Sequence, residues 1–141
     1  MIKEITSETK IKVAFFDLDP MNIVWHGNYV KYLEQARCDM FSKIGYTYMD
    51  MYNDGFMYPI AKMEFKFIKP STFGDKLRVE CELKDIEPAI TIKYIIYNEE
   101  TGEKIFKAKS MQICVDKHSM QSIYAEPVNL KEKIEQYENS L

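Results

Sequence analysis

Two carboxylates and a histidine lie close together near the beginning of the sequence, in the stretch DLDPMNIVWHG. Asp19 directly precedes a proline, Asp17 lies two residues before it, and His26 precedes an amphipathic segment. A carboxylate can accept a proton from water or attack a carbonyl carbon. The N–H groups at the start of a helix have no partner within the helix and can stabilise a developing oxyanion. The stretch therefore combines a candidate base or nucleophile with a candidate oxyanion site.

Each of these side chains also has a purely structural interpretation. An aspartate before a proline often caps a helix or forms a turn, and Asp19 alone would fit that role. We interpret Asp17 as a residue that supports the local structure. The imidazole of His26 is either a functional group or a packing residue, and the sequence favours neither. No metal site is expected, because the only other histidine, His118, is far away in sequence and the three cysteines include no Cys-x-x-Cys pair.

The elements that must position this stretch can be predicted from periodicity. Residues 27–44 repeat apolar side chains at spacings of three and four, which predicts a long amphipathic helix that ends at Gly45. A strand is expected before the stretch, at Ile11–Phe16. After the helix the period changes to two, and a short C-terminal helix is expected with Asn129 as its N-cap. The alternating segments predict strands at residues 61–68, 76–86, 91–97 and 104–115.

The order of these elements predicts an α+β fold. No helix separates the last four strands, so we expect them to pair antiparallel and to wrap around the long helix. Alternation in residues 61–68 predicts a half-buried strand, and the segment Asn98–Gly102 predicts a hairpin turn between the last two strands.

The composition is typical of one globular domain that spans residues 1–141. Hydrophobic residues make up 46% and charged residues 29%, and the net charge of −3 argues against nucleic acid as a partner. No apolar run approaches the roughly 18 residues that a membrane span requires. The charged N-terminus lacks the apolar core of a signal peptide, so we expect a soluble, cytoplasmic protein. Its cysteines, Cys38, Cys81 and Cys114, are expected to be reduced and buried.

The stretch resembles a motif of the hotdog-fold acyl-CoA thioesterases. The similarity is carried by D-x-D-P-x-x-I-V-x-x-x-N-Y before an amphipathic helix, and more weakly by the P-x-x-x-G-D turn at residues 70–75. More narrowly, the chain resembles the 4-hydroxybenzoyl-CoA thioesterase family and its bacterial Tol-Pal-associated relatives. The resemblance covers residues 13–115. Asn22 stands where relatives often have glycine, and asparagine tolerates the left-handed backbone that such a turn requires.

This resemblance implies a fold, an assembly and a set of site residues. The fold would be a hotdog, with a curved antiparallel sheet around a central helix. Two subunits would pair their sheets, in a homodimer or a homotetramer, with the active site at the interface. Asp19 would serve as nucleophile or general base, and the backbone N–H of His26 would bind the thioester carbonyl. We expect Trp25, Gly27 and Asn28 to contact the substrate.

The implied substrate is an acyl-CoA, so phosphate-binding lysines should exist. We select Lys66 and Lys69, although a lysine on a strand is more often simply solvated. No cofactor is expected, because coenzyme A is part of the substrate. The acyl group, and the choice between coenzyme A and acyl-carrier protein, stay open. Two other functions stay open as well, which are a hotdog hydratase and a non-catalytic domain that binds acyl-CoA.

Overall fold

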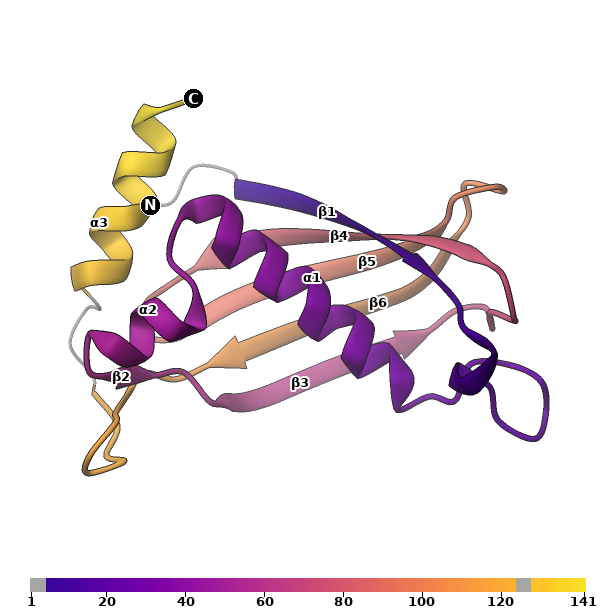
Figure 1. Ribbon diagram of the computed structural model, residues 1–141, viewed down its shortest axis with the longest axis horizontal. Helices are drawn as coiled ribbons and strands as arrows, with labels where there is room; N and C mark the ends of the chain where they lie inside the picture. Colours follow the sequence, from indigo (N-terminus) through magenta and orange to yellow (C-terminus); the bar gives the residue numbers. More distant parts are fainter. Residues whose placement is uncertain (1–4, 124–127) are drawn as a thin grey trace.

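The computed structural model describes residues 5–123 and 128–141. Its centre is a five-stranded antiparallel sheet in the order β1-β4-β5-β6-β3, and the long helix α1 crosses one face of this sheet (Figure 1). The predicted α+β class is therefore confirmed. The sheet and this helix consist of β1 (Ile5–Lys12), α1 (Asn28–Ile44), β3 (Ile60–Phe67), β4 (Lys76–Asp85), β5 (Ile90–Asn98) and β6 (Lys104–Gln112).

Helix α1 forms where the periodicity predicts it. It begins after Gly27 and ends at Gly45, whose φ of 86° allows the left-handed backbone that closes the last turn. Val30, one of the apolar residues in the predicted spacing of three and four, is 37% exposed, because it is rotated by about 100° from the preceding buried residue. The other predicted apolar residues are buried against the sheet, which removes their surface from water; they are Tyr29, Leu33, Ala36, Met40, Phe41 and Ile44.

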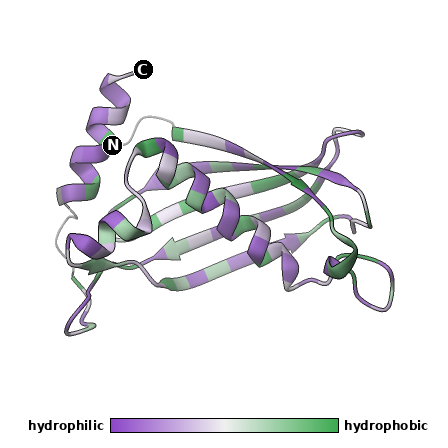
Figure 2. Ribbon diagram, viewed as in Figure 1, coloured by the Kyte–Doolittle hydropathy of each residue, from purple (hydrophilic) through white to green (hydrophobic). Residues whose placement is uncertain are grey.

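The strands alternate as period two requires, and the sheet therefore has an inner and an outer face. In β4 the buried residues Leu77, Val79, Cys81 and Leu83 alternate with more exposed charged residues. Figure 2 shows this alternation of hydrophobic and hydrophilic residues along the strands. The predicted hairpin joins β5 to β6, where the N–H of Asn98 donates to the carbonyl of Glu103 at 2.9 Å.

The first strand was predicted in the wrong place. Strand β1 ends at Lys12, and Phe15–Asp17 form a single 3₁₀ turn instead. Phe15 and Phe16 are 73% and 86% exposed, so their β propensity does not decide their structure. The strand was missed because its inner face includes the small polar residues Ser7 and Thr9, which hide the apolar alternation.

The two edges of the sheet differ in a way that matters for assembly. Strand β1 buries its inner face beneath α1, whereas β3 is exposed along nearly its whole length. The prediction that β3 is half-buried is thus wrong for the single chain. On its inner face Phe65 and Phe67 are 41% and 55% exposed. Strand β3 pairs with β6, not with β4, so the last four strands are antiparallel but do not form a simple succession of hairpins.

Smaller elements complete the chain. Helix α2 (Tyr48–Asn53) is capped by Thr47, whose side chain accepts a hydrogen bond from the N–H of Asp50. Helix α3 (Val128–Asn139) begins before Asn129, so the predicted N-cap is wrong. Two short strands, β2 (Phe56–Met57) and β7 (Val115–Asp116), pair with each other. In the described parts of the chain, no helix is long and apolar enough to cross a membrane.

A buried arginine links α1 to α2 and to the sheet, and no sequence pattern indicated this role. Arg37 is 3% exposed and forms an ion pair with Glu34 on the same helix. Its guanidinium also donates to the hydroxyl of Tyr48 at 2.5 Å and to that of Tyr94 at 3.2 Å. Each of the three guanidinium nitrogens thus has a partner, as a buried charge requires. Cys38 on the same helix is exposed, so the expectation of three buried thiols is wrong for one of them.

Candidate active site

The stretch that carries Asp19 is a small closed loop. An isolated bridge pairs Leu18 with Val24, and the N–H of Asp19 donates to the carbonyl of Ile23 at 2.9 Å. Asn22 has a φ of 62°, so the predicted left-handed residue is confirmed. The loop lies at the end of the sheet opposite α3 (Figure 1). It is held closed by its own backbone before helix α1 begins.

The carboxylate of Asp19 is partly exposed and organises this loop. Its Oδ1 accepts a hydrogen bond from the N–H of Met21 at 2.8 Å. This is a turn-forming contact of the kind that aspartate often makes. Asp19 does not cap α1, because the N-cap of that helix is Gly27. Within the described residues, Oδ2 of Asp19 has no hydrogen-bond partner, so one carboxylate oxygen is available for chemistry.

Asp17, the other aspartate of this stretch, is buried and only 8% exposed. Its Oδ2 accepts hydrogen bonds from the N–H of Ala14 at 3.0 Å and from the hydroxyl of Tyr32 at 2.8 Å. Burial and the contact with Asp17 raise the pKa of Tyr32, so the phenol keeps its proton and stays a donor. The side chain of Asn28 donates to the carbonyl of Asp17 at 2.8 Å. The prediction that Asp17 supports the local structure fits these contacts.

The start of α1 offers free backbone donors. Among the residues that the structure describes, no acceptor binds the N–H of His26 or of Gly27. The neighbouring N–H groups are already used, since Trp25 donates to Asp17 at 2.9 Å and Asn28 donates to Trp25 at 2.8 Å. The two free donors lie at the positive end of the helix dipole, where an oxyanion is stabilised.

Trp25, which precedes these donors, restricts which residue can occupy position 27. The ring of Trp25 lies over Gly27, so that a Cβ on this glycine would come within 2.2 Å of the indole. Trp25 is 48% exposed, and its ring lies 5.1 Å from that of His26. The His26 side chain is exposed. Trp25, His26 and Gly27 therefore form one surface, while Asn28 is buried beneath it.

The P-x-x-x-G-D turn at residues 70–75 holds the loop in place, a role that was not predicted from the sequence. The carbonyl of Ser71 accepts the N–H of Val24 at 2.8 Å, and the hydroxyl of Thr72 donates to the carbonyl of Asn22 at 2.8 Å. Asp75 in turn accepts the N–H of Thr72 at 2.9 Å. The only signal was the proline and glycine of a turn, and such residues do not show what the turn touches.

The remaining predicted residues lie elsewhere. Lys66 is on β3, and Lys69 follows this strand and forms an ion pair with Glu103. His118 lies in a turn where its N–H donates to Asp116 at 2.9 Å. In residues 5–123 and 128–141, no three His, Cys, Asp or Glu side chains are grouped so that they could hold a metal ion.

Comparison with known sequences decides the family. The sequence profile of the thioesterase-like superfamily matches residues 13–136. The chain belongs to the thioesterase-like superfamily. A relative in this group is the Bacillus subtilis protein named "Putative acyl-CoA thioesterase YneP", which is 34% identical over 118 residues. The match covers 83% of this chain and 85% of that protein. The Asp17–Gly27 stretch lies within residues 13–136, the part of the chain that the superfamily profile matches.

Solved structures of other thioesterases share the fold. The DHNA-CoA thioesterase of Staphylococcus aureus superposes with a TM-score of 0.82 and is 26% identical, over 96% of this chain and 94% of that one. A mutant 4-hydroxybenzoyl CoA thioesterase complexed with 4-hydroxybenzoyl CoA has a TM-score of 0.81 at 19% identity, over 92% of this chain and 99% of that one. The predicted hotdog fold and family are therefore confirmed.

Proposed function

We propose that this protein is an acyl-CoA thioesterase, which hydrolyses the thioester of an acyl-CoA to a free acid and coenzyme A. The observation that carries the proposal is the pair of unpartnered N–H groups of His26 and Gly27 at the start of α1, next to the closed loop of Asp19. Membership of the thioesterase-like superfamily supports the same reaction. Neither a metal nor a cofactor enters this mechanism.

In the proposed reaction the carbonyl oxygen of the thioester accepts the two free N–H groups. Oδ2 of Asp19 takes a proton from water as the water oxygen bonds to the carbonyl carbon. The tetrahedral intermediate then collapses, the C–S bond breaks, and the thiolate of coenzyme A leaves and is protonated. As a nucleophile, Asp19 would instead form a mixed anhydride that water cleaves. One oxyanion donor contributes on the order of 100-fold in rate, and a base adds roughly 100-fold or more.

The other predicted substrate contacts differ in how directly they can act. Trp25 presents an exposed ring next to His26, so it can cover the substrate. Asn28 is buried and its amide is used by Asp17, so we propose that it acts by fixing the loop. Lys66 and Lys69 stay proposed phosphate contacts, and Lys69 would have to exchange Glu103 for the phosphate.

We further propose that the active unit is a homodimer that pairs β3 with β3 of a second copy. Strand β3 has a neighbour on one side only, and such an edge is a template for pairing. Its inner face exposes Phe65 and Phe67, beside the half-exposed Ile68, whereas the inner face of the other edge strand, β1, is buried. A second copy would cover this apolar strip, and a twofold contact is the commonest closed assembly.

A panel of thioesters tests the proposed function. Purified protein is incubated with saturated, aromatic and enoyl thioesters of coenzyme A, and free thiol is measured. We expect thiol release from at least one of them. A hydratase would change only the enoyl substrate and release no thiol, and a binding domain would bind the panel without turnover. Either of these results would refute the assignment.

A further inference from the structure

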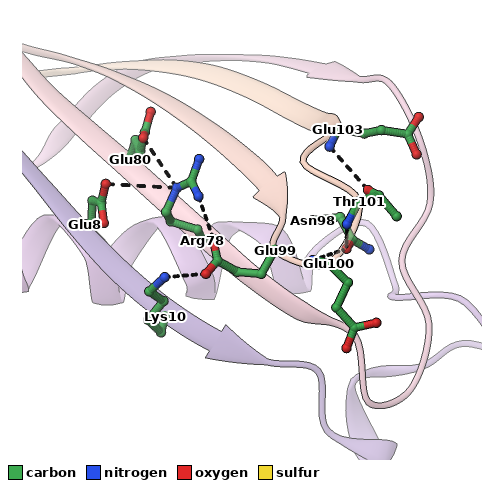
Figure 3. Close-up of polar contacts among 9 residues, drawn as sticks. All are labelled: Glu8, Lys10, Arg78, Glu80, Asn98, Glu99, Glu100, Thr101 and Glu103. Atoms are coloured by element: carbon green, nitrogen blue, oxygen red, sulfur yellow. Dashed lines mark hydrogen bonds and ion pairs between the residues drawn. The ribbon is translucent and has the colours of Figure 1, made fainter.

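The outer face of the sheet carries charges that are satisfied in one region and unsatisfied in another. On the β1–β4 side, Arg78 lies between three carboxylates, at 2.6 Å from Glu99, 3.4 Å from Glu80 and 4.0 Å from Glu8. Lys10 also forms an ion pair with Glu99 (Figure 3). Lys10 and Arg78 therefore have anionic partners, whereas Lys12 and Lys76, which lie opposite each other at the end of the same two strands, form no ion pair within the described residues.

The opposite half of the same face carries four lysines without such partners. We call this group the lysine array, and its members are Lys66 on β3, Lys93 on β5, and Lys107 and Lys109 on β6. Within the described chain, none of the four forms an ion pair. The nearest carboxylates in the register, Glu82 and Glu64, are bound to other lysines.

The sheet register forces these lysines together. Lys93 lies directly opposite Lys109, and Lys107 lies directly opposite Lys66. Like charges at directly opposite positions destabilise a sheet. Glu82 and Glu64 lie opposite Lys93 and Lys109 on their outer sides, so the positive charge is least compensated at Lys66 and Lys107, where a bound anion would relieve the repulsion.

The array lies in a hollow that suits a small anion. The hollow has a volume of about 670 Å³ and crosses all five strands, with Ile95 at its centre. This volume is in the range of small-molecule sites. Four glutamates also line the hollow: Glu64 and Glu82 border the array directly, and Glu8 and Glu80 lie on its β1–β4 side. A large acidic protein or a nucleic acid would meet these carboxylates, whereas a phosphate group fits between them.

The Lys66 end of the array is also near the candidate active site. Lys66 is followed by Phe67, whose ring centroid lies 5.9 Å from that of Tyr29 in the first turn of α1. Strand β3 ends at Phe67, and four residues later the carbonyl of Ser71 binds the loop of Asp19. A long, flexible ligand bound at the outer face can therefore reach around this strand end to the free N–H groups of α1.

We propose that the lysine array binds the phosphate groups of coenzyme A, while its pantetheine arm carries the thioester around the end of β3. This inference rests on the proposed thioesterase function, and it adds Lys93 of β5 and Lys107 and Lys109 of β6 to the proposed contact of Lys66. The nucleotide end of coenzyme A carries a diphosphate and a 3′-phosphate, which are the anions that a group of lysines recognises as point charges.

Calorimetric titration of the full chain with coenzyme A and with pantetheine tests the proposal without turnover. The double variant Lys107→Ala/Lys109→Ala should bind coenzyme A at least about tenfold more weakly, because two charged contacts are lost. The control Lys12→Ala/Lys76→Ala removes two opposed, unpaired charges from the same face outside the hollow, and we expect a change of less than about twofold. Pantetheine binding should be the same in all three proteins.

Kinetics and light scattering complete the test. The array variant should raise KM for acyl-CoA without changing kcat, and it should hydrolyse acyl-pantetheine normally. Equal losses in both double variants would overturn the proposal, as would a change in oligomeric state confined to the array variant, which would identify the array as a subunit contact. If coenzyme A binds as predicted but no thioester is cleaved, the proposed enzyme fails and the phosphate site stands.

Discussion

We predict that Asp17, and not Asp19, is the aspartate that stabilises the fold, because its carboxylate is buried and hydrogen-bonded. Asp17→Ala removes an acceptor that serves the N–H of Ala14 and the hydroxyl of Tyr32. Hydrogen bonds to a charged group contribute about 1.5–3 kcal/mol each, and the two donors would be left without a partner. We expect the free energy of unfolding to fall by about 3–4 kcal/mol. For a chain of this length that corresponds to a fall in Tm of roughly 12 °C.

Thermal unfolding followed by circular dichroism measures this effect, with Asp17→Asn as the matched control. Both donors bind the same oxygen, Oδ2, and the amide oxygen of the asparagine can take its place, so we expect a loss of only about 1 kcal/mol. Tyr32→Phe combined with each variant completes a double-mutant cycle. An Asp17→Ala protein that unfolds within about 2 °C of the wild type would refute the assigned supporting role.

Three other predictions concern the oxyanion site, the assembly and the thiols. His26→Ala should retain most activity, whereas His26→Pro should lose at least about 100-fold in kcat, because proline has no N–H; equal losses would show that the imidazole acts instead. The double variant Phe65→Asp/Phe67→Asp should be a monomer by light scattering and should release little thiol. A fully active monomer would refute the interface. Cys38 should be the one thiol that reacts readily with Ellman's reagent, since the other two are buried; rapid labelling of a second thiol would contradict this.

The low reactivity expected of the buried thiols has an electrostatic cause. Burial raises the pKa of Cys81 to about 12, and burial also raises the pKa of Cys114. The thiolate is the reactive form, and burial disfavours it. Raising the pH to 9 should therefore increase labelling of the exposed Cys38 and leave these two thiols protected while the fold is intact.

The parts of the fold with strong periodicity could be predicted from the sequence. Helix α1 and strands β4 to β6 bury one face regularly, so the spacing of their apolar residues indicates both type and position. Strand β1 was misplaced because Ser7 and Thr9 face the interior and interrupt the pattern. Phe15 and Phe16 look like strand residues but lie in an exposed turn, since neighbouring backbone contacts, not propensity, decide their structure.

The candidate site could be predicted only in its local parts. The left-handed Asn22 and the start of α1 follow from neighbouring residues, and the structure has both. The contacts of Ser71 and Thr72 with the loop join segments about 50 residues apart, which no local pattern encodes. The same is true of the lysine array, because its lysines meet only through the register of three strands.

The central claim is that Asp19 performs the chemistry while Asp17 supports the loop. The most direct test is the rate constant of thiol release by Asp19→Asn, measured on the best thioester of the panel. We predict that kcat falls at least about 100-fold, because a base or nucleophile is lost. The Tm should stay within about 2 °C of the wild type, since Asp19 is partly exposed and the asparagine oxygen can still accept from Met21. A folded Asp19→Asn protein with a near-normal kcat would contradict the account.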